Sequence, residues 1–102
     1  MTDRKLLEDA AKAVGGGAWH PLTHDTPNGR WNPLTDDGDA LRLMVNLGLE
    51  IYHSVNDGCW TVFVGYPKDG RIVYLMEVWG DDQFAATRRA IVRAAAAIGA
   101  AK

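Results

Sequence analysis

Three apolar stretches in the second half of the chain constrain the fold most, because they have the pattern of three consecutive β-strands. They span 49–55, 59–66 and 71–79 and are rich in β-branched and aromatic residues. The segments between them, 56–58 and 67–70, contain Asn, Asp, Pro and Gly, which are typical of tight turns. The sequence therefore predicts an antiparallel meander whose strands are joined by these two loops.

Both faces of the predicted meander are apolar. With these loop lengths, Val55 pairs with Cys59 and Tyr66 pairs with Arg71. One face then carries Leu49, Ile51, Phe63, Ile72, Tyr74 and Met76, and the other carries Tyr52, Trp60, Val62, Val64, Val73 and Leu75. An antiparallel sheet with one face in water normally alternates apolar with polar side chains. We therefore expect helices on both faces, or a dimer interface on a face that a helix fails to cover.

Three helices are predicted to flank the meander. The first spans 2–14 and ends at consecutive glycines, the second spans 37–47 after a cap at Thr35 or Asp36, and the third spans 81–98. The second and third are expected on one face of the sheet and the first on the other. The predicted apolar stripe of the second helix consists of Leu41, Met44, Val45 and Leu47.

These elements define an α+β fold, a three-stranded antiparallel meander covered by helices on both faces. This is an α/β/α sandwich of order α-loop-αβββα. The length of 102 residues fits a single domain. Within it we distinguish an N-terminal helix with its glycine linker (1–17), a tryptophan-containing loop (18–36) and an αβββα core (37–99).

Composition excludes several classes of protein. The formal net charge of -2 argues against a generally basic nucleic-acid binder. A single cysteine, Cys59, excludes an intramolecular disulfide framework, and we expect its thiol to be buried. No apolar run is long enough to span a bilayer, and the first residues lack the apolar stretch of a signal peptide. We therefore expect a cytoplasmic protein that does not enter a membrane.

The loop at 18–36 contains a short repeat of the form W-x-P-L-T-x-D, which begins at Trp19 and again at Trp31. In one interpretation each copy places a tryptophan and a leucine in the core as loop anchors. In the other, the loop is a recognition surface, because long loops inside compact domains are often functional. The candidate recognition residues are Trp19, His20, His24, Trp31 and Asn32.

No catalytic constellation is present in the sequence. His20 and His24 have H-x3-H spacing, but the prolines and glycines around them argue against a helix, and a complete set of metal ligands is missing. The acidic cluster at 36–39 departs from the calcium-loop pattern, and helix capping explains it. Cys59 has no His or Asn pattern around it that would indicate a nucleophile. We therefore predict no enzyme activity, no metal and no cofactor.

Three arginines of the third helix, Arg88, Arg89 and Arg93, form the strongest local basic group. With the αβββα order they suggest a double-stranded-RNA-binding domain, which places a basic helix terminus on phosphates. However, Asp81 and Asp82 stand at this terminus and would repel phosphate. Binding of nucleic acid through these arginines is therefore the alternative function and not the leading one.

The string WNPLTDDGDALRL at 31–43, together with the alanine-rich helix RRAIVRAAAAIG, resembles the phage ABA-sandwich domain family of small phage and prophage proteins. The resemblance covers roughly 31–99. It implies an α/β/α sandwich and a phage context, and it implies no activity, cofactor or catalytic residue. The leading hypothesis is thus a phage- or prophage-encoded module that binds an unidentified phage or host protein and exists as a monomer or homodimer.

Overall fold

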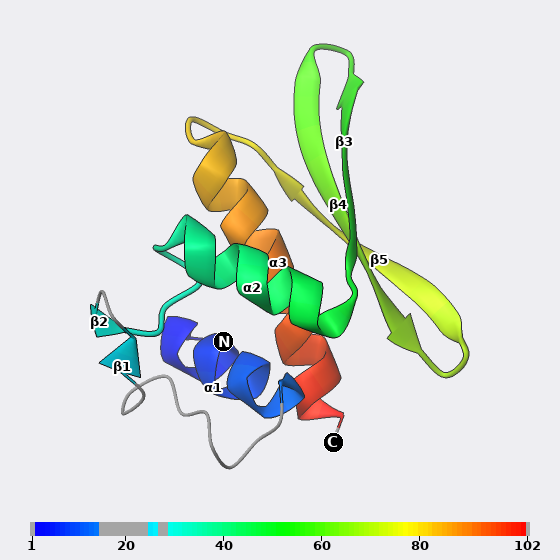
Figure 1. The fold of residues 1–102 in the computed structure, drawn as a ribbon. Coiled ribbons are helices and arrows are strands. Elements are labelled where there is room, and N and C mark those ends of the chain that lie inside the picture. Colours follow the sequence, from blue (N-terminus) through cyan, green and yellow to red (C-terminus); the bar gives the residue numbers. More distant parts are fainter. Residues whose placement is uncertain (1, 15–24, 27–28, 102) are drawn as a thin grey trace.

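The structure is a computed structural model that describes residues 2–14, 25–26 and 29–101 (Figure 1). Its elements, in chain order, are α1 Asp3–Ala13, β1 Asp25–Thr26, β2 Gly29–Arg30, α2 Asp37–Leu47, β3 Glu50–Asn56, β4 Cys59–Lys68, β5 Arg71–Val78 and α3 Gln83–Ala100. Strands β3, β4 and β5 form one antiparallel sheet in that order, and β1 pairs with β2 in a separate short ladder. The predicted α+β class, the meander and the order of its helices are confirmed. None of the described helices is both long and apolar enough to cross a bilayer.

Two Asp-Gly dipeptides close the meander more tightly than predicted. In Asp57-Gly58 the φ angles are 53° and 75°, and in Asp69-Gly70 they are 53° and 79°. Positive φ at both central residues is characteristic of the type I′ hairpin turn, whose twist matches that of the flanking strands. The strand ends therefore pair as Asn56 with Cys59 and Lys68 with Arg71, so the longer predicted loops are wrong.

The tighter first turn shifts β3 by one residue relative to β4, which exchanges the two faces of β3. Ile51 pairs with Val64 rather than with Phe63, and Tyr52 pairs with Phe63. The second turn shifts the register by an even number of residues, so the predicted alternation of β5 is retained. The face toward the helices carries Leu49, Ile51, Val62, Val64, Val73 and Leu75. The opposite face, which we call the open face, carries Tyr52, Phe63, Ile72, Tyr74, Met76 and Val78.

The helices begin at side-chain caps. Thr2, Asp36 and Asp82 each accept a hydrogen bond from a backbone N–H in the first turn of α1, α2 and α3, respectively. A cap of this kind typically contributes about 1 kcal/mol. Helix α2 ends at Gly48, whose φ of 64° turns the chain into β3. Of the two predicted caps of α2, Thr35 and Asp36, the structure shows Asp36, whereas α3 begins slightly later than predicted because Asp82 caps it.

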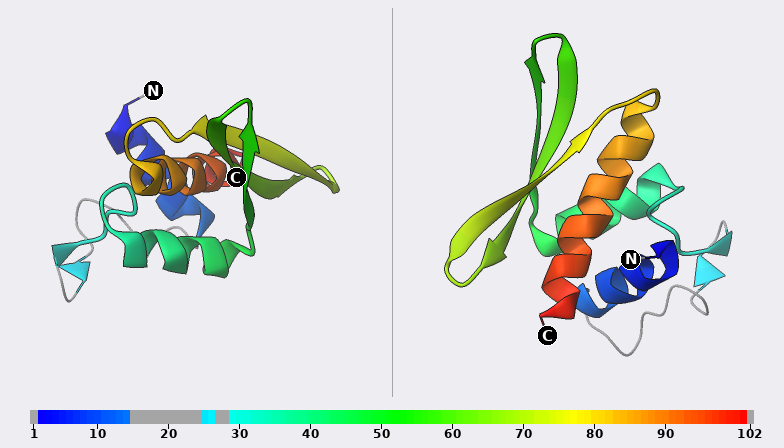
Figure 2. Two further views of the ribbon diagram at one scale, coloured as in Figure 1. Left: turned by 90° about the horizontal axis from the view of Figure 1, so that it is seen from above. Right: turned by 180° about the vertical axis from the view of Figure 1, so that it is seen from behind.

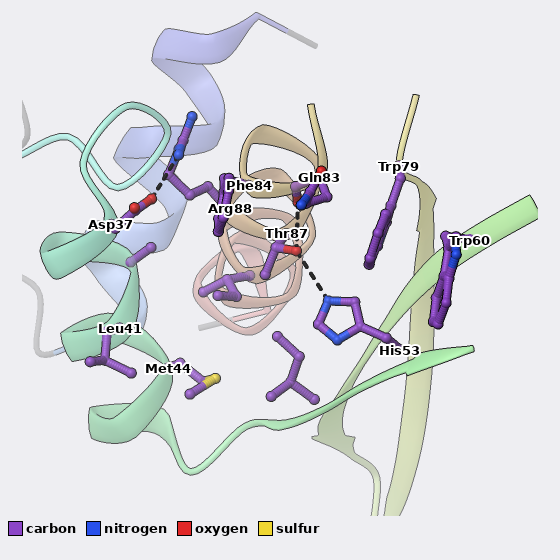
Figure 3. Close-up of a pocket in the computed structure, with 13 residues that line it drawn as sticks. Asp37, Leu41, Met44, His53, Trp60, Trp79, Gln83, Phe84, Thr87 and Arg88 are labelled. Carbon is purple, nitrogen blue, oxygen red and sulfur yellow. Dashed lines mark hydrogen bonds and ion pairs between the residues drawn. The ribbon is translucent and has the colours of Figure 1, made fainter. Parts of the chain in front are cut away.

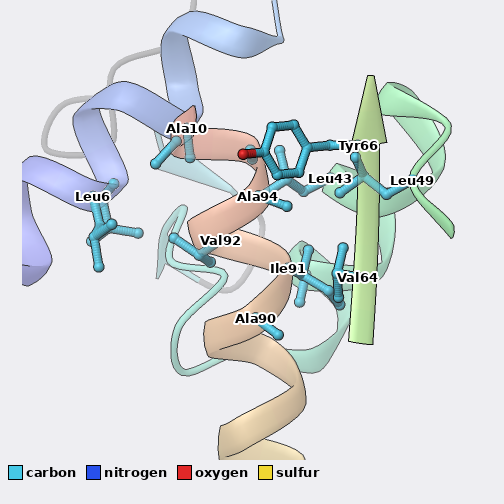
Figure 4. Close-up of a cluster of buried hydrophobic side chains, with 14 of the residues drawn as sticks. Leu6, Ala10, Leu43, Leu49, Val64, Tyr66, Ala90, Ile91, Val92 and Ala94 are labelled. Carbon is cyan, nitrogen blue, oxygen red and sulfur yellow. The ribbon is translucent and has the colours of Figure 1, made fainter. Parts of the chain in front are cut away.

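Helix α3 lies at the centre of the fold, where it contacts α1, α2, β4 and β5 (Figure 2). Its buried positions are mostly alanines, and a short side chain lets a neighbouring backbone approach closely. Figure 4 shows Ala90 and Ala94 of this helix within the cluster that includes Leu6 of α1, Leu43 of α2 and Val64 of β4. The buried residues of α3 are Ala86, Ala90, Ile91, Val92, Ala94, Ala95, Ala96 and Gly99.

Helices α1 and α3 approach each other closely at Gly99. A Cβ atom at this position would overlap the carbonyl oxygen of Asp9 and would lie 3.1 Å from the backbone nitrogen of Ala13. The carboxylate of Asp9 is buried at the same crossing, and the ammonium groups of Lys5 and Lys12 lie 3.2 Å and 3.6 Å from it. The crossing therefore needs glycine on α3 and paired charges on α1.

Among the described residues, the three helices lie on the same side of the sheet (Figures 1 and 2). Helices thus pack on the sheet as expected, but α1 packs on α3 instead of crossing to the open face. On the open face, Tyr52, Ile72, Tyr74 and Met76 remain 48%, 46%, 46% and 56% exposed. Among the described residues, helices therefore cover one face of the sheet. Helix α1 does not cover the open face, because its apolar stripe is buried against α3. That stripe consists of Leu6, Leu7, Ala10 and Ala11.

One polar contact fixes an aromatic ring on the open face. The hydroxyl of Tyr74 donates a hydrogen bond to Oε1 of Glu50 over 3.1 Å, and its ring meets that of Tyr52 edge to face at 6.0 Å. The hydrogen bond to Glu50 raises the pKa of Tyr74 above its ordinary value of 10.0, and partial desolvation raises it further. The neutral phenol is thus favoured by the contact, and the phenolate is disfavoured.

We expect Gly99→Ala to destabilise the fold although alanine is the better helix former. Helix propensity alone would stabilise the protein by about 1 kcal/mol. The overlap with Asp9 opposes this gain and should give a net loss of roughly 1–3 kcal/mol, as overpacking does elsewhere. Urea unfolding followed by circular dichroism measures the difference. The control is Ala100→Gly at the exposed end of α3, which should cost only the propensity term, and stabilisation by Gly99→Ala would contradict the close crossing.

We also expect Tyr74 to ionise at a higher pH in the folded protein than in the unfolded chain. Its folded pKa is raised, so the Glu50 contact contributes stability below pH 10.0 and loses this contribution as the pH rises through the folded pKa. Ultraviolet absorbance titration, with Tyr74→Phe subtracted to isolate the Tyr74 signal, measures this pKa. In Glu50→Gln the same signal should move to lower pH. An unchanged titration in that variant would remove Glu50 as the cause.

Candidate functional site

An apolar groove runs between α2, α3 and the helix-facing side of the sheet (Figure 3). Its volume is about 660 Å³, which lies within the usual range of ligand sites. Helices α2 and α3 form two of its walls, and the β3–β4 hairpin and the end of β5 form the third. The apolar side chains that line it include Leu41, Met44, Ile51, Trp60, Trp79 and Phe84.

The apolar walls of the groove are open to solvent. Leu41, Trp60 and Phe84 are 56%, 44% and 61% exposed. The predicted apolar stripe of α2 is therefore wrong in part, because Leu41 and Val45 point away from the core while Ala40 and Leu43 are buried. The physical reason is the closeness of α2 to the alanine-rich α3. Ala40 is 2% exposed and belongs to the same core cluster as Ala90 of α3, whereas Leu41 lines the groove.

Two tryptophans form the end of the groove at the sheet. The rings of Trp60 and Trp79 stack with a centroid distance of 4.9 Å and an interplanar angle of 15°. The backbone N–H of Trp79 donates to the carbonyl of Trp60, which extends the β4–β5 ladder and holds the two rings side by side. His53 meets Trp79 edge to face at 5.3 Å. The indole Nε1 of Trp79 is buried without a hydrogen-bond partner among the described residues.

The polar groups of the groove are held in fixed orientations. Nε2 of His53 lies 3.3 Å from Oγ1 of Thr87, and that hydroxyl lies 2.8 Å from the carbonyl oxygen of Gln83. The hydroxyl of Thr87 donates to the carbonyl oxygen of Gln83, and the same hydroxyl lies within hydrogen-bond distance of the His53 ring. At the other end, Arg88 donates to a carboxylate oxygen of Asp37 over 2.7 Å.

Among the described residues, His53 and Thr87 do not form an oriented pair of base and nucleophile. Activating the hydroxyl of Thr87 would need a base that accepts its proton and a third group that orients this base. The hydroxyl of Thr87 donates to Gln83, and no hydrogen bond from the described residues holds Nδ1 of His53. Among the described residues there is also no group of three or more His, Cys, Asp or Glu placed to hold a metal ion.

The predicted recognition loop is described only in part. Trp31 is 3% exposed and belongs to the core cluster. Asn32 organises the turn before α2, since its backbone N–H donates to Asp39 over 2.9 Å and its side-chain oxygen accepts from the N–H of Leu34 over 3.0 Å. Trp19, His20 and His24 lie outside the described residues, so a recognition role for the loop stays a prediction.

The acidic cluster at 36–39 serves helix α2 and the turn that precedes it. Asp36 caps the helix by accepting the N–H of Asp39 over 2.7 Å. The side chain of Asp39 is buried and accepts from Asn32 and, over 2.7 Å, from Arg42. Helix capping therefore explains Asp36, as the sequence predicts, whereas Asp39 holds the preceding turn and Asp37 pairs with Arg88 of α3.

The three arginines proposed for nucleic-acid contact each tie α3 to a different neighbour. Arg88 pairs with Asp37 of α2, Arg89 lies 3.3 Å from a carboxylate oxygen of Asp3 of α1, and Arg93 pairs with Glu77 of β5. Arg88 also donates to the carbonyl of Leu34, and Arg93 to that of Met76. A phosphate would have to displace these carboxylates. Binding of nucleic acid therefore stays a prediction that no contact among the described residues favours.

The prediction that the thiol of Cys59 is buried is wrong, because the residue is exposed. The residue follows the Asp57-Gly58 turn and lies on the side of β4 that the helices do not cover. The prediction rested on the general tendency of free cysteines to be buried, whereas the end of a hairpin that extends beyond the helices has little to cover it.

No family model, curated protein or solved structure was found to match this chain. The resemblance to the phage ABA-sandwich family therefore stays a prediction. The candidate site rests on the geometry of the groove alone.

The main groove residues Leu41, Trp60 and Phe84 were not predicted from the sequence as site residues. Leu41 and Phe84 lie on helix faces with helical apolar spacing, which does not distinguish a core wall from an open one. For His53 a signal was present. The Asp57-Gly58 dipeptide favours a two-residue turn, and that register would have placed His53 on the same face of the sheet as Trp60.

Two leucines of α2 provide a direct test of the groove wall. Leu43 is 2% exposed and Leu41 is 56% exposed. We expect Leu43→Ala to cost about 2–5 kcal/mol, as for other buried leucines. Leu41→Ala should stay within about 0.5 kcal/mol of the wild type. Urea unfolding monitored by circular dichroism gives both values, and similar losses in the two variants would place Leu41 in the core and remove the groove.

Proposed function

We propose that this protein is a non-enzymatic protein-interaction module whose groove accepts apolar side chains of a partner polypeptide. The observation that carries the proposal is the combination of the groove volume with the exposure of its walls. The groove has a volume of about 660 Å³, yet Leu41, Trp60 and Phe84 remain 56%, 44% and 61% exposed. Exposed apolar clusters of this kind mark interaction sites more often than single exposed residues do.

The openness of the groove favours a polypeptide over a small molecule. Sites for small ligands enclose most of the ligand surface. Here the side chains of Leu41 and Phe84 stand on two helices on either side of the opening, and each would gain cover only from a partner broad enough to reach both. A partner segment that inserts two or more apolar side chains meets this requirement.

The chemistry of the walls supports the same proposal. Tryptophan is enriched among the residues that contribute most to binding energy at protein interfaces, and Trp60 stands at the open end of the groove. Polar groups at the margin, the Arg88–Asp37 pair and Gln83, are placed to orient a partner's backbone. An apolar centre with a polar rim is the usual composition of such interfaces.

The biological setting of the proposal comes from the resemblance noted in the sequence. It implies a phage or prophage protein that acts in the cytoplasm of the host cell and binds a phage or host protein. The groove would be the contact surface for such a partner.

Selection from a random peptide library displayed on messenger RNA tests the proposal with the intact protein as bait. We expect the selected peptides to share two or more apolar anchors. Titration calorimetry with synthetic copies should show that Leu41→Ser and Phe84→Ser each weaken binding by at least about tenfold. The matched control is Val45→Ser, because Val45 is 66% exposed on the same helix as Leu41 and does not line the groove.

Two outcomes would overturn the proposal. In the first, the selected peptides bind Leu41→Ser, Phe84→Ser and wild type equally, which would place the contact elsewhere. In the second, no peptide is selected while aromatic fragments shift the NMR signals of His53 and Trp79, which would make the groove a small-molecule site. Circular dichroism of each variant establishes that a loss of binding is not a loss of fold.

A further inference from the structure

The open face of the sheet is a second apolar surface, on the side opposite to the groove. Met76 and Val78 are 56% and 53% exposed there, and Tyr52, Ile72 and Tyr74 are 48%, 46% and 46% exposed. None of the described helices packs over it. An antiparallel sheet that faces water normally carries polar side chains on that face, so this composition indicates a covered surface.

The centre of the open face is shaped for close packing. Gly65 of β4 leaves room for its neighbours on β5, since a Cβ atom there would lie 2.7 Å from Cε1 of Tyr74 and 2.9 Å from Cγ2 of Ile72. These two side chains therefore lie across the glycine. Tyr52 and Phe63 stack beside them with a centroid distance of 5.0 Å and an interplanar angle of 11°. The resulting surface projects little from the sheet. It therefore suits packing against another sheet, because stacked sheets lie only about 10 Å apart.

The area of the face meets the requirement of a stable dimer. At roughly half exposure, the five most exposed side chains of the open face present on the order of 100 Å² each. Two copies packed face to face would bury about 1,000 Å² from these side chains alone, which is the approximate lower limit for a specific interface. Neighbouring polar side chains at the margin add to this area.

The charge of the face favours a second copy of the chain over a different partner. Glu50 is the one charged side chain at the described strand positions of this side, and its carboxylate accepts the hydroxyl of Tyr74. The surface thus has no charge pattern that would select a complementary acidic or basic protein. Two-fold symmetry brings each patch against an identical patch, and an apolar surface tolerates this arrangement where a charged one would not.

We propose that two copies of this chain pack sheet to sheet through their open faces, around a two-fold axis near Phe63. The strands of the two sheets cross at about 30°, as in other aligned sheet packings. Both grooves remain on the outer sides of the dimer, so the pairing does not depend on the proposed function of the groove. The dimer would present two identical binding sites that face away from each other.

Sedimentation velocity over a concentration range tests the proposal with the full chain. We expect a monomer–dimer equilibrium with a Kd in the micromolar range. Met76→Glu places a charge in the middle of the interface and should raise this Kd at least about a hundredfold, since an unpaired buried charge is costly. Val45→Glu adds the same charge to an exposed position of α2 and should leave the equilibrium unchanged.

A second measurement keeps the test independent of the stability of one variant. Isotope-filtered NMR on a mixture of labelled and unlabelled protein should show contacts between copies among Tyr52, Phe63 and Met76. Ile72→Lys, on the same face, should abolish them. A protein that stays monomeric at about 1 mM would overturn the proposal. So would a dimer that both Met76→Glu and Ile72→Lys leave intact, since it would have to form through the strand edges or another surface. Leu41→Ser serves to separate the two proposals, because it should weaken peptide binding without changing the dimer.

Discussion

The fold depends on how closely three neighbours, α1, α2 and the sheet, pack against helix α3. Alanines on the buried sides of this helix let α1, α2 and the sheet pack around it at once, and Gly99 allows α1 to approach until its backbone touches α3. One arginine then ties α3 to each neighbour, through Asp37, Asp3 and Glu77. The short side chains of α3 thus set its distance from these neighbours. The arginines at its margin set the orientation of the neighbours relative to α3.

This arrangement explains why one side of the sheet remains without helical cover. The apolar stripe of helix α1 packs on α3, so this stripe does not cover the open face. The β3–β4 hairpin also extends beyond the helices (Figure 1), which leaves Trp60 and His53 at the margin of the groove instead of in the core. The groove and the open face are therefore two results of the same packing, one on each side of the sheet.

Local signals in the sequence predicted the elements well, and long-range geometry accounts for the errors. The caps at Thr2 and Asp36 and the left-handed Gly48 act within one helical turn, so they can be identified from neighbouring residues. The register of β3 depended on whether Asn56 belongs to the turn or to the strand, and counting it in the turn exchanged both faces of that strand. The rotation of α2 depended on the space that α3 leaves. No periodicity within α2 could have shown that Ala40 is buried and Leu41 is not.

The pairing of α1 with α3 has a consequence for how the chain folds during synthesis. Arg89 and Asp3, which join the two helices, are 86 positions apart in sequence. At ordinary translation speeds of about 5–20 residues per second, α1 leaves the ribosome roughly 4–17 s before its partner. A helix this short is only marginally stable alone. The meander, whose hairpins are local, can form during that interval, and α1 completes the fold only when α3 has been made.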